Sequence, residues 1–208
     1  MTTDTSSITE TISRHTQTDT RKLIMRKARE LMLSRSYLGL NFQVLADQVG
    51  IRKASLYHHF PSKEALGVAL VDDARERFIR WTDTVKDETP ARQAVAYVRM
   101  FRDQIGAGER VCPVGATASE WEMIEPALQD AVRALSRSHA DWMTGVAERL
   151  AKYPGVDPLL MGNAKPKQWG AHVAALCQGA LMMARLNKDA KVFDAAVAPL
   201  VSRLNTLH

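Results

Sequence analysis

Glycine and proline residues divide this chain of 208 residues into segments of helical length. Within these segments apolar residues recur three or four positions apart, which is the period of an amphipathic helix. Helices are predicted over 19–36, 42–49, 53–60, 62–86, 90–105, 127–152, 168–186 and 190–204. The stretches 109–126 and 153–167 contain several proline and glycine residues; the first is predicted to be irregular or weakly helical and the second to be a loop. No segment shows the strict alternation of a strand, so the sequence predicts an all-α fold.

Composition narrows the class of protein. The chain is 46% hydrophobic and 25% charged, which is typical of a globular protein with a sizeable core. No apolar run approaches the ~18 residues that span a membrane, and no secretory signal is recognisable. Cys112 and Cys177 are too few for a disulfide framework. We therefore expect a cytoplasmic protein with no membrane association.

The net charge of +5 is concentrated in the first third of the chain. Residues 1–63 carry ten basic and five acidic side chains, whereas residues 64–208 carry eighteen of each. Concentrated positive charge is typical of a surface that faces phosphate groups. Residues 1–18 are polar and rich in threonine and serine, so we expect them to form a disordered arm.

Two short predicted helices with a glycine turn between them occupy residues 42–60. Gly50 makes the turn, and Ala46 is small where the two helices cross. Leu45, Val49, Ile51 and Leu56 have the spacing to fill a small shared core. The second helix then presents its polar side outward, as the recognition helix of a helix-turn-helix does in the major groove.

The run from Phe42 to Leu66 resembles the DNA-binding signature of the TetR family. Its most specific part is Leu-Tyr-His-His-Phe-x-Ser-Lys-Glu-x-Leu, which begins at Leu56. The resemblance covers residues 19–67, and it implies a DNA-binding domain over 19–61 and a ligand-binding and dimerisation domain over 62–208. It further implies a homodimer whose recognition helices enter successive major grooves. The long helix from Ser62 links the domains, and a ligand in the second domain releases the DNA.

The resemblance assigns the DNA contacts to the polar residues of this block. The first residues of the recognition helix are candidates for base edges, since arginine and lysine pair well with guanine. Later residues of that helix, the start of the preceding helix and the first turn of the long helix are candidates for phosphate or sugar. Packing of Tyr57 into the small core is the alternative for that residue. In chain order the candidates are Asn41, Gln43, Arg52, Lys53, Ser55, Tyr57, His58 and Lys63.

The second predicted domain holds many aromatic and methionine side chains, which line adaptable apolar pockets. An ordinary role in the core is the alternative for each of them. As a set they predict a small apolar or aromatic effector. The candidate ligand-binding residues are Trp81, Tyr97, Met100, Phe101, Trp121, Trp142 and Cys177.

Cys112 begins a Cys-x-x-Gly stretch that is followed by Glu120. The stretch resembles a TetR subgroup that includes repressors responding to electrophiles and oxidants. Arg110 is close enough in sequence to favour a reactive thiolate, so Cys112 is a candidate redox residue. An inert buried cysteine is the alternative.

The last two predicted helices are rich in small residues, which allow helices to approach closely. In the family layout they form a four-helix dimer interface, and packing inside one protomer is the alternative. The residues are Ala171, Ala174, Ala175, Gly179, Ala180, Ala184, Ala195, Ala196 and Val197.

The sequence thus predicts a ligand-responsive repressor that binds a palindromic DNA operator as a homodimer. An activator or a ligand-independent regulator is the alternative. An enzyme is not expected, because no phosphate-binding loop, nucleophile elbow or metal-ligand cluster is found. We expect neither cofactor nor metal: adjacent His58 and His59 would point in different directions on a helix. Glu120, Glu122 and Glu125 resemble an ordinary charged face.

Overall fold

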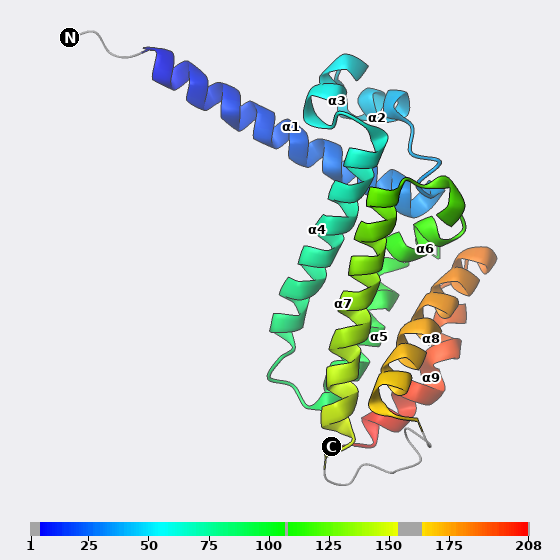
Figure 1. Cartoon of the computed structure of the whole chain (residues 1–208). Helices are drawn as coiled ribbons and strands as arrows, with labels where there is room; N and C mark the ends of the chain where they lie inside the picture. The colour runs from blue at the N-terminus through cyan, green and yellow to red at the C-terminus, as the bar shows by residue number, and fades with distance from the viewer. Residues whose placement is uncertain (1–4, 107, 154–163, 208) are drawn as a thin grey trace.

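The computed structural model describes residues 5–106, 108–153 and 164–207, and within these ranges every regular element is a helix (Figure 1). The predicted all-α fold is confirmed. In chain order the elements are α1 Thr5–Arg35, α2 Phe42–Val49, α3 Lys53–His59, α4 Lys63–Thr84, α5 Pro90–Gln104, α6 Pro113–Ala118, the 3-10 turn η1 Trp121–Met123, α7 Pro126–Leu150, α8 Pro166–Asn187 and α9 Lys191–Asn205.

The helix-turn-helix forms for local reasons. The Asn41 side chain caps α2 by accepting hydrogen bonds from the backbone N–H groups of Gln43 (2.7 Å) and Val44 (3.3 Å). Gly50 ends α2 with a φ of 76°, a left-handed conformation that glycine adopts without steric cost. Ser62 caps α4 through the N–H of Ala65 (3.0 Å). The chain therefore changes direction at the positions that the sequence predicts.

Helix α1 is longer than predicted. It begins at Thr5, so the expected disordered arm is wrong for residues 5–18, and residues 1–4 lie outside the described residues. Residues 5–18 contain neither proline nor glycine, so nothing in them blocks the helix from extending toward the N-terminus. Part of the predicted loop 153–167, residues 154–163, is likewise not described. The stretch 109–126 contains two short helical elements, α6 and η1, in line with the weakly helical alternative.

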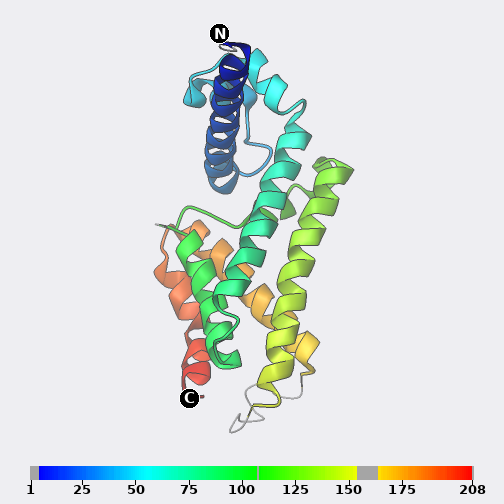
Figure 2. The same ribbon diagram turned by 90° about the vertical axis from the view of Figure 1, so that its left-hand side faces the viewer.

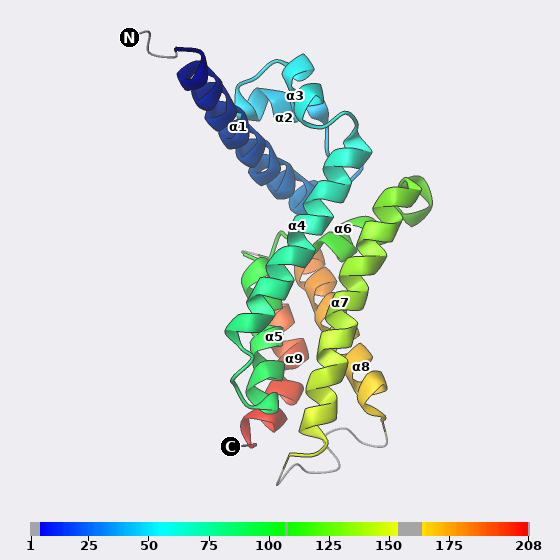
Figure 3. The same ribbon diagram turned by 60° about the vertical axis from the view of Figure 1, so that its left-hand side comes forward.

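The apolar side chains form two cores. The upper core joins α1, α2, α3 and the start of α4 with α6 and the first half of α7. It contains Leu45, Leu56, Phe60 and Leu66, each at most 2% exposed. The lower core joins the rest of α4 and α7 with α5, α8 and α9. Helices α4 and α7 run side by side through both levels (Figures 1 and 3) and so connect the helix-turn-helix with the lower bundle.

A close approach fixes the top of α4. A Cβ added at Gly67 would lie 2.7 Å from Tyr37 Cε2 and 3.2 Å from Leu128 Cδ2. Only a residue without a side chain allows α4 to pack so tightly against Tyr37 and α7. In Figure 2, α1 and the helix-turn-helix lie above the bundle, and α4 connects the two levels. No helix in the described ranges is long and apolar enough to cross a membrane.

Candidate functional site

The recognition helix α3 presents an exposed polar face. Arg52, Lys53 and His58 are exposed, Tyr57 is 47% exposed, and Ser55 is half-buried. On the opposite side, Leu56 is fully buried in the upper core. The structure thus brings the predicted base-contacting residues together on one short face.

The other candidates around α2 also have local contacts. Asn41 and Gln43 are exposed, and the Gln43 amide donates a hydrogen bond to Asp47 (2.9 Å). The Tyr57 ring packs on the Phe42 ring, with the two ring centroids 5.1 Å apart. One side of Tyr57 therefore contacts the small core, and the other side lies outside it. Both interpretations of Tyr57 describe part of its environment.

Lys63 turns inward rather than away from the protein. Its ammonium donates to the Leu38 carbonyl (3.1 Å) and lies 4.6 Å from the centroid of the Tyr37 ring. Burial lowers the pKa of Lys63, while Glu125 and Glu120 act in the opposite direction. A phosphate contact through this ammonium stays a prediction, and it requires the side chain to leave these partners.

Two glutamates tie the DNA-binding end to the bundle. Glu120 is 8% exposed and accepts hydrogen bonds from the Ser36 hydroxyl and the Leu38 N–H (2.9 Å). Glu125 accepts from the Tyr37 hydroxyl (2.9 Å), and burial together with Glu125 raises the pKa of that phenol. The sequence predicts an ordinary charged face here, and the hydrogen bonds of both glutamates correct that interpretation. Their partners are more than 80 residues away, and no periodic pattern marks such pairs.

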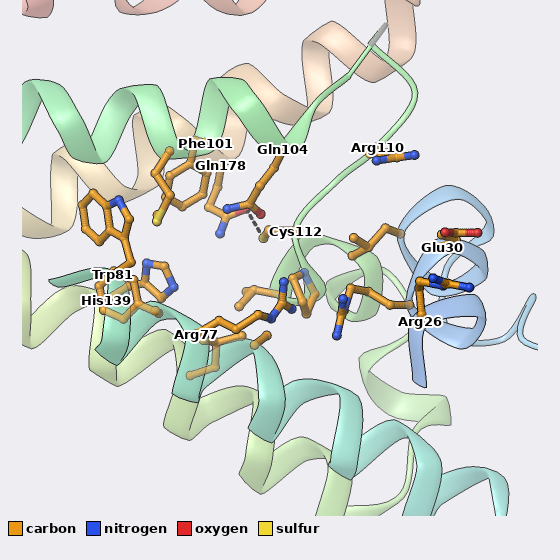
Figure 4. A pocket seen from close by; sticks show the side chains of 18 residues that line it. Arg26, Glu30, Arg77, Trp81, Phe101, Gln104, Arg110, Cys112, His139 and Gln178 are labelled. Atoms are coloured by element: carbon orange, nitrogen blue, oxygen red, sulfur yellow. Dashed lines mark hydrogen bonds between the residues drawn. The ribbon is translucent and has the colours of Figure 1, made fainter. Parts of the chain in front are cut away.

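A cavity of about 440 Å³ lies where α1 meets the bundle. This volume is within the range of small-molecule sites. Figure 4 shows aromatic side chains at one end, arginines at the other and Arg77 between them. The lining residues are Arg26, Arg29, Glu30, Leu33, Ala74, Arg77, Phe78, Trp81, Met100, Phe101, Gln104, Arg110, Cys112, Pro113, Val114, Leu135, His139 and Gln178.

The aromatic end contains a histidine that is kept neutral. His139 stacks on Phe78 with ring centroids 3.7 Å apart, and its Nδ1 lies 3.2 Å from the Tyr97 hydroxyl. Burial lowers the pKa of His139 to about 4. Trp81 stacks on the same Phe78 at 5.8 Å. His139 is not among the candidates predicted from the sequence, because its aromatic partners come from helices distant in sequence.

The cationic end is organised by one carboxylate. Asp73 Oδ2 accepts hydrogen bonds from Arg29 Nη2 (2.6 Å) and from Arg77 Nε (3.1 Å). Arg29 lies on α1 and the other two residues lie on α4. Burial lowers the pKa of Arg77, as does the nearby charge of Arg29. One carboxylate therefore holds two guanidinium groups and joins the two helices.

Three of the seven predicted ligand-binding residues line this cavity, namely Trp81, Met100 and Phe101. The other four lie outside its lining, and a ligand-binding role for them stays a prediction. Tyr97 is fully buried behind Phe78 and Phe101, and Cys177 is fully buried in the lower core. Trp142 packs on Trp81 but faces a different, shallow depression. Trp121 packs against the upper core with Arg133 over its ring (4.8 Å).

Cys112 does line the cavity, and its thiol is an N-cap. The Sγ atom accepts a hydrogen bond from the Gly115 N–H (3.3 Å) and donates to Gln178 Oε1 (2.9 Å; Figure 4). Burial raises the pKa of Cys112, although the hydrogen bond from Gly115 opposes this shift. In Figure 4 the Arg110 guanidinium lies away from the sulfur. The expected support of a thiolate by Arg110 is therefore wrong, because burial dominates.

Helices α8 and α9 expose an apolar face. Met182, Met183 and Leu186 are 51%, 50% and 76% exposed. The small residues on the same side of α8 and on α9 are also exposed, namely Ala171, Ala175, Gly179, Ala195 and Ala196. Ala180, Ala184 and Val197 are buried within the lower core, so the alternative of packing inside one protomer applies to them. Exposed apolar surface of this kind marks interaction sites.

No group of three or more His, Cys, Asp or Glu side chains in the described ranges has an arrangement that could hold a metal ion. His58 and His59 belong to no such group. The candidate sites are therefore the α3 surface, the cavity and the α8–α9 face.

Two family models match the chain. Residues 24–70 match the bacterial regulatory proteins of the tetR family, and residues 90–198 match the C-terminal domain of LmrA/YxaF-like transcriptional regulators. Among curated proteins, the chain is 36% identical over 61 residues to the HTH-type transcriptional repressor NemR of Escherichia coli. That match covers 29% of this chain and 31% of NemR, so it spans less than a third of that relative.

Solved structures agree over most of the chain. A TetR-family transcriptional regulator from Agrobacterium tumefaciens superposes with a TM-score of 0.79 at 28% identity, covering 90% of this chain and 98% of that one. The reduced form of E. coli NemR gives 0.72 at 20% identity, covering 87% and 95%. A TetR regulator from Legionella pneumophila gives 0.75 at 20% identity, covering 89% and 96%. The latter two matches indicate a shared fold.

Proposed function

The chain belongs to the TetR family of bacterial transcriptional regulators, and from this premise we propose that it is a ligand-responsive repressor that binds a palindromic operator as a homodimer. The observation that carries the proposal is the path of α4, which starts directly after the recognition helix and ends beside the cavity. A ligand that moves α4 would also move α3.

The DNA-binding part of the proposal rests on the face of α3. Arg52 and Lys53 are exposed at its N-terminal end, where a recognition helix reaches base edges. The sign of regulation follows the relative, because the matched E. coli protein is named a repressor. An activator has no feature here that favours it.

The homodimer part rests on the α8–α9 face. Two copies of this face placed about a twofold axis form a four-helix interface. Twofold symmetry is the commonest symmetry among dimers of identical chains. A twofold axis in the protein then requires an operator with twofold symmetry.

The decisive experiment measures DNA binding by fluorescence anisotropy, using duplexes selected from a random library. We expect selection of palindromic sites, two chains per site, and an affinity that falls steeply with salt because phosphate contacts release counterions. A protein that selects no sequence and binds independently of salt would contradict the proposal. A reporter under the selected operator, with and without the gene, then tests repression.

A further inference from the structure

We propose that the cavity binds an aryl carboxylate, whose carboxylate takes Arg29 and Arg77 from Asp73 and thereby uncouples α1 from α4. This inference rests on the proposed function, because it names the ligand class and the coupling route of the same cavity. It combines three observations: an excess of positive charge, an unused buried donor and an aromatic wall.

At the cationic end of the cavity, guanidinium groups outnumber the carboxylates of the described residues that could balance them. Arg29 and Arg77 share a single oxygen of Asp73. Arg26 and Arg110 line the same end. Glu30 lines it too, but its carboxylate already pairs with Lys27 (3.3 Å). An anionic group in this cavity would therefore meet attraction from several guanidinium groups at once.

Arg29 carries a donor that the protein does not use. Its Nε atom is buried and has no hydrogen-bond partner among the described residues, while Nη2 donates to Asp73. A buried donor without a partner is destabilising, because it has lost its hydrogen bond to water. The Nε–Nη2 edge of a guanidinium matches the two oxygens of a carboxylate. A ligand carboxylate can satisfy both nitrogens, whereas Asp73 satisfies one of them.

The opposite wall selects the body of the ligand. Trp81, Met100 and Phe101 line it, and His139 adds a ring that burial keeps neutral. Flat apolar groups pack well against such a wall. A volume of about 440 Å³ accepts one or two aromatic rings with a short acidic group. A small inorganic anion would leave the wall unfilled.

The position of the arginines supplies the coupling. Arg29 belongs to α1, whose Ile24 and Ala28 are fully buried in the upper core beneath the helix-turn-helix. Asp73 belongs to α4, three turns below the point where α4 begins. The Arg29–Asp73 ion pair thus links α1, at the DNA-binding end, to α4, which runs into the bundle. A carboxylate that competes with Asp73 loosens this link, and linkage requires that DNA binding in turn weakens the ligand.

The binding test compares acids with their uncharged amides. 2-Naphthoate and biphenyl-4-carboxylate are titrated against 2-naphthamide and biphenyl-4-carboxamide, with tryptophan fluorescence as the readout, since Trp81 lines the cavity. We expect each acid to bind at least about tenfold more tightly than its amide, as hydrogen bonds to charged groups predict. If neither acid binds more tightly than its amide, the proposal is overturned.

Variants then locate the charge. Arg29→Gln and Arg77→Gln should each weaken the acids about tenfold and leave the amides unchanged. Arg80→Gln is the matched control, because Arg80 also lies on α4 but does not line the cavity and pairs with Glu76 at 3.6 Å. Asp73→Asn should act in the opposite direction and tighten acid binding about 3- to 10-fold, since it removes the competing carboxylate. Damage to the fold would not tighten binding, so a loss or no change in Asp73→Asn counts against the proposal.

Operator release separates this inference from the proposed function. Release by the acids, weakened in Arg29→Gln and Arg77→Gln, supports both. Equal release by acids and amides, insensitive to all three variants, leaves a ligand-responsive repressor but overturns the carboxylate site. Tight, arginine-dependent binding that never lowers operator affinity overturns the coupling step, together with the ligand-responsive part of the proposed function.

Discussion

The recognition surface and the cavity obtain their residues in different ways. The recognition surface comes from one continuous stretch, residues 41–63, held by two caps, one glycine turn and a small apolar core. The cavity collects side chains from α1, α4, α5, α6, α7 and α8, spread from Arg26 to Gln178. The surface proposed to contact DNA is thus built from local sequence, whereas the proposed ligand cavity is built from tertiary packing.

The difference extends to charge. The recognition surface is an exposed face whose cations meet solvent, so its charge shows in the composition of the first third of the chain. The cavity takes its cations from both segments, Arg26 and Arg29 from the first and Arg77 and Arg110 from the second. They come together only where α1 packs against α4 and the bundle. Net charge along the sequence therefore indicates the first site and not the second.

The largest effect is expected at the α8–α9 face, through which two copies of the chain would form the proposed dimer. Gly179→Glu places a charge in the middle of the exposed α8 face, where a Cβ meets no atom of the same chain within 4 Å. A buried charge without a partner costs about 3–5 kcal/mol. We expect monomers in sedimentation velocity and a loss of operator affinity of about 100-fold or more.

Ala127→Glu is the matched control, since Ala127 is exposed in the first turn of α7. Ala180→Glu is unsuitable, because Ala180 is 3% exposed and its replacement would disrupt the lower core. A Gly179→Glu protein that remains dimeric would show that the α8–α9 face serves another purpose.

The next effect separates base contacts from the phosphate contact within the recognition surface. Lys53→Ala should cost about 1–3 kcal/mol on the preferred operator and change base preference, as expected for a base contact. Lys63→Ala should weaken all sequences alike and also lower stability, because its ammonium bonds the Leu38 carbonyl. Anisotropy titrations on a set of single-base operator variants measure both. A change of preference in Lys63→Ala alone would reverse the two assignments.

The same contrast explains what the sequence could reveal. The bounds of α2 and α3, the buried Phe60 and Leu66 and the exposed face of α3 follow from periodicity, caps and a glycine turn, which are local. The pairs Glu120–Leu38 and Arg29–Asp73 join residues 82 and 44 positions apart, and His139 reaches Tyr97 across 42. No local pattern encodes such pairs. Trp121 and Cys177 were assigned by residue type, which does not tell a cavity wall from a filled core.

A moderate effect is expected on the pH dependence of stability, to which the cavity contributes. Burial lowers the pKa of His139 from 6.5 to about 4, so between these values the unfolded chain binds a proton that the folded chain refuses. Stability is therefore lost as the pH falls from 6.5 to about 4, by about 1–3 kcal/mol from this residue. His139→Gln removes this contribution. Urea unfolding at pH 7.5 and pH 5 should show a smaller loss in the variant than in the wild type. An equal loss would mean that His139 is protonated inside the fold.

The smallest effect is expected from the cavity thiol. Cys112→Ser keeps both hydrogen bonds, since a hydroxyl can accept from the Gly115 N–H and donate to Gln178, and serine is a good N-cap. We expect a change in stability within about 1 kcal/mol and unchanged operator release by a reversible ligand.

Burial raises the pKa of Cys112, so the unreactive thiol form prevails at neutral pH. Iodoacetamide should accordingly alkylate Cys112 slowly in the folded protein and quickly in urea. If instead Cys112→Ser abolishes release by an electrophile that acts on the wild type, the thiol is the sensor. In that case the cavity serves to bring the electrophile to the sulfur, and its arginines act on the approach of the reagent rather than on the link between α1 and α4.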